Sequence, residues 1–461
     1  MINLFYMDGL PVAVMGLGKS GMATADALAR AGAEVWAWDD SQAKRDEAEA
    51  AGHRIVDLTT ADLSELTTVV WSPGIPHTFP KPHPVAERAR KANLEIVCDI
   101  ELMARSERDA AYVGITGTNG KSTTTALIGH VMQDAGRRTA VGGNLGTPVL
   151  TLDPLGVGGT YVLEMSSYQL ELTLSITFDV AVLLNVTPDH LDRHGGMDGY
   201  VAAKKLIFHR QTRPRTAIVG VDDAICRGIC EELKAAGDQH VWPISAEGRA
   251  EGGVYAEDGW LVDDTQGTAE RVAELAGFPA LLGKHNWQNA AAAFAACKAA
   301  GVPAPAIVAA MKTFPGLAHR QQLVRTIGGV RFVNDSKATN ADAAEKALAT
   351  FDPIYWILGG RAKETGLDGL DAYMGRVRHA FLIGEASETF AAWLEARNVP
   401  HTRCGTLDAA VARAAELALA EKKDGACVLL SPACASWDQF TSFEARGDAF
   451  ARAVNDLEGA A

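Results

Sequence analysis

The sequence predicts an α/β protein built from three domains. The chain has 461 residues, and domains of soluble proteins typically contain about 100–200 residues. Short apolar runs typical of strands alternate with helical patterns, which is the arrangement that gives a parallel sheet covered by helices. Two of these runs, VAVMG and AYVGITG, lead directly into glycine-rich turns followed by helices. Such open α/β sheets bind their ligands at the carboxyl ends of the strands.

Composition narrows the class of partner. Apolar residues make up 48% of the chain and charged residues 22%, which is typical of globular proteins and argues against disorder. The formal net charge is −14 and the pI about 5.4, which argues against extended binding to nucleic acid. We therefore expect small-molecule substrates and no nucleic-acid partner.

Three features predict a cytoplasmic protein. Every apolar run is interrupted before it reaches the roughly 18 residues that a membrane-spanning helix needs, so we expect no membrane insertion. The start of the chain lacks a basic region and leads straight into a strand and a glycine turn, unlike a cleaved signal. The seven cysteines are scattered and odd in number, as expected for reduced thiols. We also expect a monomer.

Composition shifts along the chain divide it into blocks. The first, residues 1–99, contains the strand-like runs VAVMG, EVWAW and TTVVW. The second, residues 100–316, runs from AYVGITG through YVLEM and VAVLLNV to an Ala-rich helix. FPGL at 314–317 supplies Pro and Gly where that helical pattern ends. The third, residues 317–461, repeats the α/β pattern, and residues 237–280 predict a small hairpin excursion on the second block.

The first glycine-rich turn predicts a nucleotide site. Gly16, Gly18 and Gly21 enclose Lys19 and Ser20 between a strand and a helix, and Asp39 stands at the end of the next strand. Glycines permit a tight turn there, and the N–H groups at the start of a helix favour a pyrophosphate. The pattern alone leaves three possibilities: NAD, another diphosphate-bearing nucleotide, or a structural turn.

The second glycine-rich turn, GITGTNGKST at 114–123, predicts a phosphate-binding loop. Backbone N–H groups can cradle phosphates, Lys121 can reach the terminal phosphates, and the hydroxyl of Ser122 can ligate Mg²⁺. The spacing departs from the standard loop, because Ile115 stands six residues before Lys121. This departure indicates a particular variant of the motif.

Downstream residues are candidate metal ligands. Glu164 interrupts an apolar run, and a buried carboxylate is costly unless it meets a cation, so we predict a Mg²⁺ ligand there. His190 follows another apolar run, and the pattern leaves open whether it is structural or a ligand. Lys204 and Lys205 are adjacent on an expected helix, and the pattern cannot choose between them.

Two polar clusters follow strands of the third block. They are NDSKATN at 334–340 and SPACASWDQF at 431–440, and helix capping explains part of each. The sequence contains neither a GxSxG elbow nor a Cys–His signature, so we expect the nucleophiles of any transfer reaction to belong to its substrates.

Taken together, these motifs resemble the Mur ligases of peptidoglycan synthesis, which are related to folylpolyglutamate synthases. TGTNGKST, EMSSYQLE, NVTPDHLDRH, GKHNWQNAAAA, GLAHR and NDSKATN match in order. SPG at 72–74 and LLSPACASWDQFTSFEARGDAF further resemble the members that add D-glutamate to UDP-N-acetylmuramoyl-L-alanine. The resemblance implies a Rossmann-like first domain, a P-loop-type central ATPase domain and a Rossmann-like third domain. It also implies an acyl-phosphate intermediate, formed with ATP in cytoplasmic precursor synthesis.

The resemblance also assigns residues to ligands. For ATP it implies Lys121 with the N–H groups of Thr118, Asn119, Gly120, Ser122, Thr123 and Thr124, together with Asn286, Asn289, Arg320 and Asp335. For two Mg²⁺ ions it implies Ser122 and Glu164, then His190 and a carbamylated Lys204, and so selects Lys204 over Lys205. Lys121, His190 and Lys204 would be the catalytic residues.

Two substrate sites complete the assignment. The UDP substrate is expected at Gly16, Gly18, Lys19, Ser20, Gly21, Asp39, Ser72, Gly74, Asn144, Ser166 and Gln169. D-Glutamate is expected at Lys337, Thr339, Lys363, Ser436 and Phe443. Ser41 stands where some relatives carry Arg, so the resemblance leaves the uracil contacts there undefined.

Three alternatives explain less of the sequence. A NAD-dependent dehydrogenase accounts for the first glycine turn but leaves TGTNGKST without a role. A folylpolyglutamate synthase shares the ATP chemistry, although the UDP-type first domain and SPACAS argue against it. A non-catalytic nucleotide switch needs only the central block.

Overall fold

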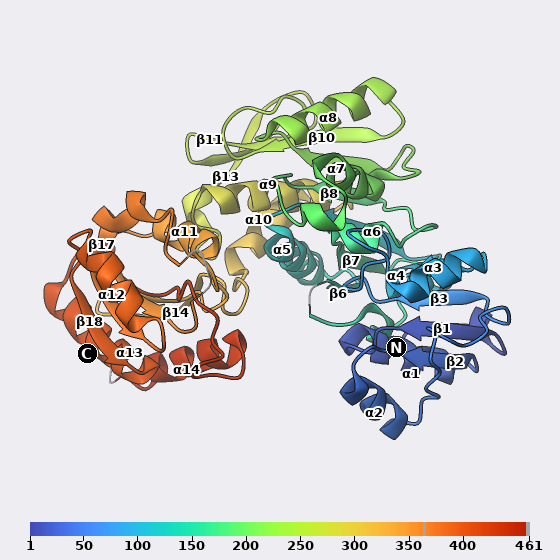
Figure 1. Cartoon of the computed structure of the whole chain (residues 1–461). Coiled ribbons are helices and arrows are strands. Elements are labelled where there is room, and N and C mark those ends of the chain that lie inside the picture. The colour runs from blue at the N-terminus through green and yellow to red at the C-terminus, as the bar shows by residue number, and fades with distance from the viewer. Residues whose placement is uncertain (145, 363–365, 458–461) are drawn as a thin grey trace. The chain divides into compact units, whose positions relative to one another are not determined.

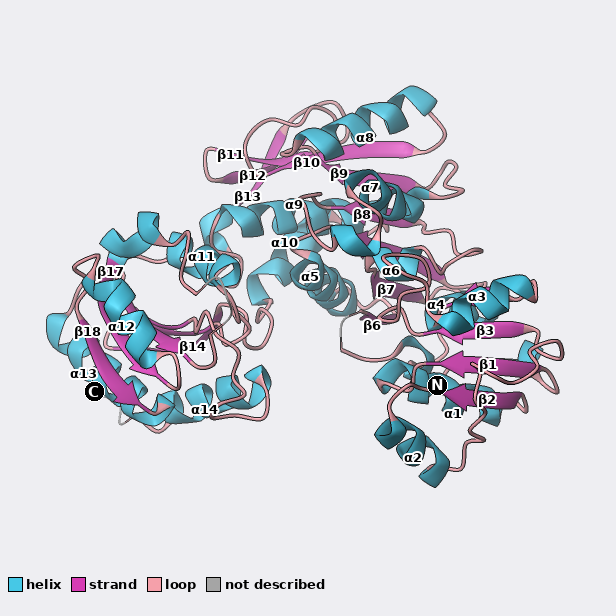
Figure 2. Ribbon diagram, in the orientation of Figure 1, coloured by secondary structure: helices cyan, strands magenta, loops and turns pink. Residues whose placement is uncertain are grey.

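The structure is a computed structural model that describes residues 1–144, 146–362 and 366–457 (Figure 1). Its contacts divide the chain into two compact units. The first comprises Met1–Gly277 and Asn286–Thr313, and the second comprises Phe278–His285 and the chain from Phe314 onward. Helices and strands alternate through most of both units (Figure 2), as the sequence predicts.

The N-terminal sheet of the first unit is parallel, in the order β2-β1-β3-β4. Its strands are short and largely buried, as expected for a sheet covered by helices. The strands are β1 (Pro11–Met15), β2 (Glu34–Trp38), β3 (Thr68–Trp71) and β4 (Glu95–Val97), and the helices are α1 (Lys19–Arg30), α2 (Gln42–Ala50), α3 (Pro84–Lys91) and α4 (Asp99–Ser106). Both α1 and the loop after β3 start at the carboxyl edge of this sheet.

The second sheet of the same unit has the order β13-β12-β11-β10-β9-β8-β5-β7-β6. Its strands are β5 (Ala111–Thr116), β6 (Thr139–Gly143), β7 (Thr160–Glu164), β8 (Val180–Leu183), β9 (Thr216–Gly220), β10 (His240–Ser245), β11 (Val254–Glu257), β12 (Trp260–Asp263) and β13 (Glu270–Glu274). Its helices are α5 (Lys121–Asp134), α6 (Ser167–Leu170), α7 (Met197–Lys205), α8 (Ala224–Ala236), α9 (Lys284–Ala299) and α10 (Ala304–Thr313). β11, β12 and β13 pair antiparallel, which confirms the predicted hairpin excursion.

One hydrophobic core connects these two sheets. A single cluster of buried hydrophobic residues extends from Ile2, through the N-terminal strands, to Cys230 of α8. Backbone bonds cross between the sheets, from Ile2 N–H to the Leu150 carbonyl (3.1 Å) and from Cys98 N–H to the Leu172 carbonyl (3.1 Å). The shared core explains why residues 1–99 and the central block form one unit, and the finer division at 99 stays a prediction.

The sheet of the second unit has the order β14-β15-β19-β16-β17-β18, with β14 antiparallel to β15. The elements are β14 (Gln322–Ile327), β15 (Val330–Asn334), β16 (Ile354–Gly359), β17 (Val377–Ile383), β18 (His401–Gly405), β19 (Cys427–Leu430), α11 (Ala341–Thr350), α12 (Ser387–Glu395), α13 (Leu407–Glu421) and α14 (Phe443–Asn455). Alternate residues face opposite cores: Trp356 packs with α11 and α12, whereas Tyr355 packs with α13 and α14. The sheet is therefore covered on both faces.

Two structural findings concern membrane spans and cysteines. No helix in the described part of the chain is both long and apolar enough to cross a bilayer. The seven cysteines are free thiols, and six of them are buried.

Candidate functional site

The predicted phosphate loop lies between β5 and α5, and its backbone is held in shape by its own lysine. Gly117 and Gly120 have φ of 154° and 85°. A Cβ at Gly120 would overlap Oδ1 of Asn289, so only glycine fits there. The ammonium of Lys121 donates to the carbonyls of Gly117 and Thr118, both at 2.9 Å. The loop therefore curves around a positive charge at the start of a helix, where anions are favoured.

Neighbouring elements fix the loop from outside. Asn185 follows β8 and accepts from the N–H groups of Asn119 (2.8 Å, at its side chain) and Thr118 (2.9 Å, at its carbonyl). The side chain of Asn185 donates to Gln288 of α9 (3.0 Å). The hydroxyls of Thr118 and Tyr200 lie 3.1 Å apart. These contacts preorganise the loop before any nucleotide binds.

The first turn of α5 presents the remaining predicted phosphate contacts. Ser122 is partly exposed, whereas Thr123 and Thr124 are buried. The hydroxyl of Thr124 donates to Oδ1 of Asn289 (3.2 Å), and Nδ2 of Asn289 donates to Asn286 (3.0 Å). Asn289 thus supports the start of α5 directly and is itself held by Asn286, while the contact of both asparagines with ATP stays a prediction.

Glu164 ends β7, and strand pairing sets it beside Ile115 of β5. The residue is 2% exposed. Its Oε1 accepts from the amide of Asn144 (2.7 Å), whereas its Oε2 is buried without a hydrogen-bond partner. A buried carboxylate oxygen without a donor is costly unless a cation meets it, so the geometry fits a metal ligand.

The structure distinguishes the two adjacent lysines of α7. Lys204 is 1% exposed and donates to the carbonyl of Gly117 (2.8 Å), with its ammonium 4.5 Å from the Tyr200 ring centre. Burial, together with the nearby Lys121, lowers the pKa of Lys204 to about 7. Lys205 instead pairs with Glu232 on the surface (2.7 Å). Of these two adjacent lysines, Lys204 is therefore the one that contacts the phosphate loop.

His190 lies at the start of η3 (Leu191–Arg193) in a left-handed conformation, with φ of 52°. Its Nε2 is 3.4 Å from a carboxylate oxygen of Asp189, and its ring centre is 5.5 Å from that of Tyr168. Its side chain is about half exposed. The described residues contain no cluster of three or more His, Cys, Asp or Glu that could hold a metal ion.

The first glycine-rich turn, between β1 and α1, is tied to the loop after β3. Gly16 has φ of 91°, and a Cβ there would lie 2.5 Å from Oγ of Ser72. Ser72 donates to the carbonyl of Gly16 (3.0 Å). Asp39 accepts from the N–H groups of Leu17 (2.7 Å) and Ser41 (2.8 Å). Gly18 caps α1, so the first-turn N–H groups open at this edge.

Other predicted substrate residues make contacts within the protein. Lys19 donates to the carbonyl of Gly146 (2.7 Å) and Gly74 accepts from Arg193 (3.0 Å). Ser166 and Gln169 form a capping box at the start of α6. Ser20 accepts from the Thr24 hydroxyl (2.8 Å), and a Cβ at Gly21 would overlap the Gly16 carbonyl. Their binding of a UDP substrate stays a prediction.

The second unit gathers most of its predicted residues after β15 and β19. Asp335 accepts from the Gln321 N–H (3.1 Å) and the Ser431 hydroxyl (2.9 Å), and burial raises its pKa to about 7. The Lys337 ammonium lies 5.5 Å from the Phe443 ring centre. Buried polar atoms without a hydrogen-bond partner include Nε of Arg320 and Oγ of Ser436. Thr339 is partly exposed, and Lys363 lies outside the described residues.

Comparison with known proteins decides the family. Residues 115–297 match the Mur ligase middle domain, and residues 319–434 match the family described as Mur ligase, glutamate ligase domain. The chain is 55% identical to the UDP-N-acetylmuramoylalanine--D-glutamate ligase of Rhodospirillum rubrum over 462 residues, which covers 99% of this chain and 97% of the relative. This chain belongs to the Mur ligase family.

Other relatives and structures agree. Proteins with the same name from Paramagnetospirillum magneticum (54% identity, 100% of both chains) and Caulobacter vibrioides (52%, 99% of this chain and 98% of the relative) also match this Mur ligase. The structure of Thermotoga maritima MurC, a UDP-N-acetylmuramate-alanine ligase, matches with a TM-score of 0.57 at 16% identity, over 97% of this chain and 99% of that one. A UDP-N-acetylmuramoyl-L-alanyl-D-glutamate--2,6-diaminopimelate ligase matches with a TM-score of 0.59 at 19% identity, over 99% and 94%. The predicted α/β fold is confirmed, and this Mur ligase is an ATP-dependent ligase.

The sequence did not single out Arg446 of α14 in this Mur ligase. It is 1% exposed, and burial lowers its pKa to about 10. Its guanidinium donates to the hydroxyl and carbonyl of Ser336 (both 2.9 Å) and to the carbonyl of Cys434 (3.0 Å). Arg446 therefore joins the two polar loops that carry Lys337, Thr339 and Ser436, three of the predicted D-glutamate residues. The signal in the sequence was its place within LLSPACASWDQFTSFEARGDAF, the segment that carries part of the resemblance.

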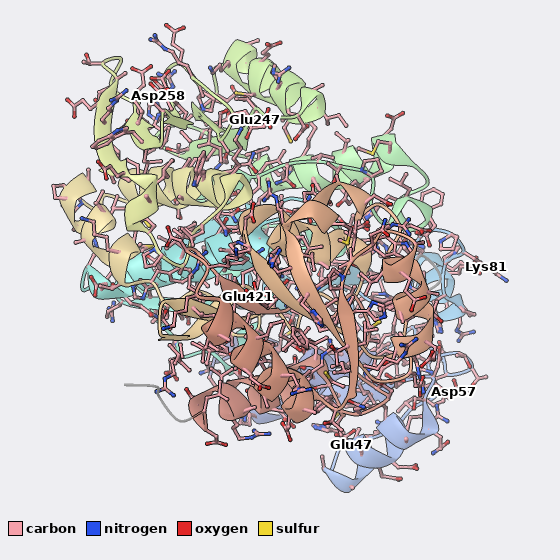
Figure 3. All side chains as sticks on the ribbon, turned by 90° about the vertical axis from the view of Figure 1, so that its left-hand side faces the viewer. Glu47, Asp57, Lys81, Glu247, Asp258 and Glu421 are labelled. Carbon is pink, nitrogen blue, oxygen red and sulfur yellow. The ribbon has the colours of Figure 1, made fainter. Side chains whose placement is uncertain are left out.

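Part of the acidic balance of this Mur ligase lies on exposed side chains. Glu47, Glu247 and Asp258, which Figure 3 labels, are exposed, and Glu47 pairs with Lys44 and Asp258 with Arg271. The phosphate loop instead holds two ammonium groups, from Lys121 and Lys204. A net charge of −14 is thus compatible with anionic substrates.

Proposed function

We propose that this Mur ligase joins D-glutamate to UDP-N-acetylmuramoyl-L-alanine at the expense of ATP, in cytoplasmic peptidoglycan precursor synthesis. The observation that carries the proposal is the preformed phosphate loop, which holds two ammonium groups, together with the buried Glu164 oxygen that has no hydrogen-bond partner at the end of the neighbouring strand β7. The full-length relatives that carry this activity in their names support the choice of substrates.

Two substitutions at electrophilic centres account for the reaction. The carboxylate of UDP-N-acetylmuramoyl-L-alanine attacks the γ-phosphorus of ATP, the bond to the β,γ-bridging oxygen breaks, and ADP leaves. The amine of D-glutamate then attacks the acyl carbon, loses a proton, and expels phosphate. Both nucleophiles come from substrates, so the protein needs to align anions and offset their charge. Lys121 and the N–H groups of the loop perform that task at the phosphates.

Glu164 and Ser122 would hold a first Mg²⁺, and His190 with a modified Lys204 a second. A bound Mg²⁺ supplies charge neutralisation for the transferring phosphoryl group. The orphan Oε2 of Glu164 fits a hard cation. Because the described residues hold no dense ligand cluster, substrate phosphates and waters would complete each shell, as Mg²⁺ prefers.

The surroundings of Lys204 support its carbamylation. A neutral lysine amine attacks CO₂ to give a carbamate and releases one proton. The cationic side chain is thereby replaced by an anionic oxygen ligand. Lys204 is 1% exposed and its pKa is lowered to about 7 by burial, so the reactive neutral amine is well populated near neutral pH. The nearby Lys121 would compensate the carbamate charge.

The remaining assignments divide between two substrates. The turn at Gly16–Gly21, with Asp39, Ser72 and Gly74, would hold the UDP substrate, and Asn144, Ser166 and Gln169 its reactive end. In the second unit, Lys337, Thr339, Ser436 and Phe443 would hold D-glutamate, as would Lys363. Arg320 and Asp335 would contact ATP.

Phosphate release tests the overall reaction. The purified protein is assayed with ATP, Mg²⁺ and UDP-N-acetylmuramoyl-L-alanine, and with D-glutamate, L-glutamate, L-alanine or a diamino acid as acceptor. We expect release that depends on D-glutamate. Release with another amino acid but not with D-glutamate would overturn the substrate assignment.

Carbamylation has its own readout. After equilibration with ¹³C-bicarbonate, ¹³C NMR of the wild type should show a carbamate signal that is absent from Lys204→Arg. The neighbouring variant Lys205→Arg is the matched control and should retain the signal. A spectrum identical in wild type and Lys204→Arg would remove Lys204 from the metal ligands.

A further inference from the structure

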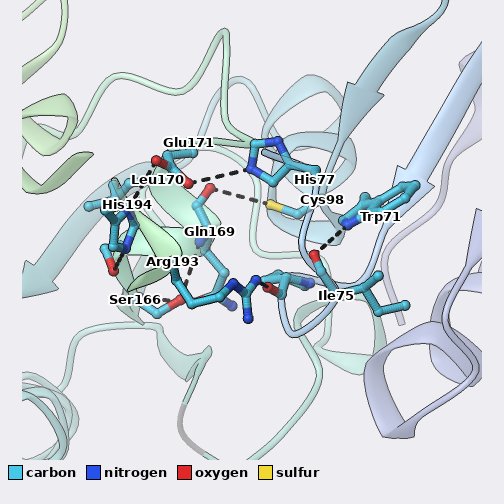
Figure 4. A network of polar contacts seen from close by, with 12 residues as sticks. Trp71, Ile75, His77, Cys98, Ser166, Gln169, Leu170, Glu171, Arg193 and His194 are labelled. Atoms are coloured by element: carbon cyan, nitrogen blue, oxygen red, sulfur yellow. Dashed lines mark hydrogen bonds and ion pairs between the residues drawn. The ribbon is translucent and has the colours of Figure 1, made fainter. Parts of the chain in front are cut away.

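A contact network joins the loop after β3 to the catalytic edge of the central sheet (Figure 4). Its centre is Glu171, which follows α6. Oε1 of Glu171 lies 3.1 Å from Nδ1 of His194, and Oε2 lies 3.4 Å from Nε2 of His77. His194 comes directly after η3 and His77 from the loop after β3. One carboxylate thus joins two segments that lie far apart in the sequence.

This carboxylate is held in its charged form. Burial alone raises the pKa of Glu171, but the contacts with His77 and His194 outweigh burial and lower it. The side chain of His194 is fully buried, and that of His77 is 11% exposed. Arg90 donates to Nδ1 of His77 (3.3 Å), and the buried Nε2 of His77 lies at ion-pair distance from Glu171 without hydrogen-bond geometry. Such enclosed contacts are screened far less than surface ion pairs.

His194 connects Glu171 to the phosphate loop. Its ring is stacked on Tyr168 (centres 5.1 Å apart, planes at 11°) and tilted against Tyr200 (5.3 Å). Its Nε2 lies 2.9 Å from the hydroxyl of Ser167. The two tyrosines in turn contact catalytic candidates, since Tyr168 lies against His190 and Tyr200 against Lys204.

Arg193, the preceding residue, reaches the opposite side. Its guanidinium donates to the carbonyls of Gly74 (3.0 Å) and Pro73 (3.4 Å), and its Cζ lies 4.6 Å from the Tyr168 ring centre. A Cβ at Gly195 would lie 3.0 Å from the Phe79 ring, so this short segment also packs closely on the loop after β3. The segment is thus fastened to that loop on both sides.

We propose that Glu171, His194 and Arg193 are positioning residues that set the loop carrying Ser72 and Gly74 at a fixed distance from His190 and the phosphate loop. The inference rests on the proposed function. The network would align the substrate carboxylate with the γ-phosphate, and small misplacements of reacting groups cost about a hundredfold in rate. The three residues act through their neighbours and do not touch the reacting atoms.

Steady-state kinetics of four variants test the network. Glu171→Gln keeps the shape of the side chain and removes its charge, while His194→Phe keeps a ring between the tyrosines and removes both polar contacts. We expect kcat/KM for UDP-N-acetylmuramoyl-L-alanine to fall about tenfold to a hundredfold in each, with KM for ATP within about twofold of wild type. The double variant should be no worse than the worse single one, because both remove the same contact. Glu232→Gln, at the surface pair with Lys205, is the matched control and should behave as wild type.

Three results would overturn the inference. They are wild-type constants in His194→Phe, equal losses toward ATP and the UDP substrate, and single losses that multiply in the double variant. Equal losses with a lowered unfolding temperature would mean a general structural role. A wild type that binds the UDP substrate but releases no phosphate refutes the proposed function instead. The network is then judged by calorimetry, where about tenfold weaker binding of that substrate is expected in both single variants.

Discussion

The two glycine-rich loops of the first unit share a backbone plan and differ in what surrounds them. Each follows a buried parallel strand, bends at a glycine with positive φ (91° at Gly16, 85° at Gly120), and opens a helix. At the second loop, two ammonium groups donate to the carbonyl of Gly117. At the first, Asp39 accepts from the N–H groups of Leu17 and Ser41.

The difference shows how one backbone device serves two purposes. Helix-start N–H groups attract an anion at both loops. The loop with concentrated positive charge suits phosphates whose bonds are to be broken, because that charge stabilises the developing transition state. The loop closed by a carboxylate suits a ligand that is held by its hydroxyl groups as well as its phosphates. The first loop would therefore contribute to binding and the second to chemistry.

Removing the ammonium of Lys121 should have the largest effect on the difference between the two loops. We expect Lys121→Ala to lower kcat at least about a thousandfold, since it removes the charge around which the loop folds. Binding of the UDP substrate should change by less than about threefold. Phosphate release gives kcat, and titration calorimetry gives the binding. Near-wild-type turnover would remove the phosphate-loop assignment.

Glu164 is expected to have the next largest effect. Glu164→Gln keeps the side-chain volume and removes the charge of the orphan Oε2. We expect the Mg²⁺ concentration for half-maximal rate to rise about tenfold to a hundredfold, comparable with other losses around metal sites. A Mg²⁺ titration of phosphate release measures it. An unchanged titration curve would show that the oxygen without a partner binds no metal.

Backbone motifs were predictable from the sequence, because glycine and strand patterns are local. The α/β fold, both glycine turns and the hairpins at 237–280 follow from such patterns. The local pattern could not tell which of Lys204 and Lys205 points to the phosphate loop, because adjacent residues on a helix differ only in what packs around them. The resemblance selected Lys204, and the contact with Gly117 agrees with that selection.

Long-range contacts escaped prediction for the same reason. Arg446 joins Ser336 to Cys434, and Glu171 joins His77 to His194. A buried Arg or a paired His looks like any surface residue when only its neighbours in sequence are known. Two residues that were predicted to bind substrates also have structural contacts that the sequence did not reveal. Gln169 takes part in the capping box of α6, and Asn289 supports the phosphate loop through Thr124.

Replacing Gly16 or Gly120 by alanine should show which substrate each loop binds. A Cβ at Gly16 would lie 2.5 Å from Ser72 Oγ, and one at Gly120 would overlap Asn289. We expect Gly16→Ala to raise KM for the UDP substrate about tenfold with KM for ATP unchanged, and Gly120→Ala to do the reverse. Initial rates with each substrate varied in turn measure both constants. Effects of both variants on the same substrate would mean that the loops share one ligand.

Lys19 should show the smallest effect and is the counterpart of Lys121 at the first loop. Its ammonium donates to the carbonyl of Gly146 in an exposed setting (2.7 Å), and exposed charges are well screened. We therefore expect Lys19→Ala to raise KM for the UDP substrate only about threefold, to leave kcat unchanged, and to lose its effect in high salt. Initial rates at low and high ionic strength test this. A fall in kcat as large as that of Lys121→Ala would mean that the first loop takes part in the chemistry, because a lysine that only holds a diphosphate affects binding and not turnover.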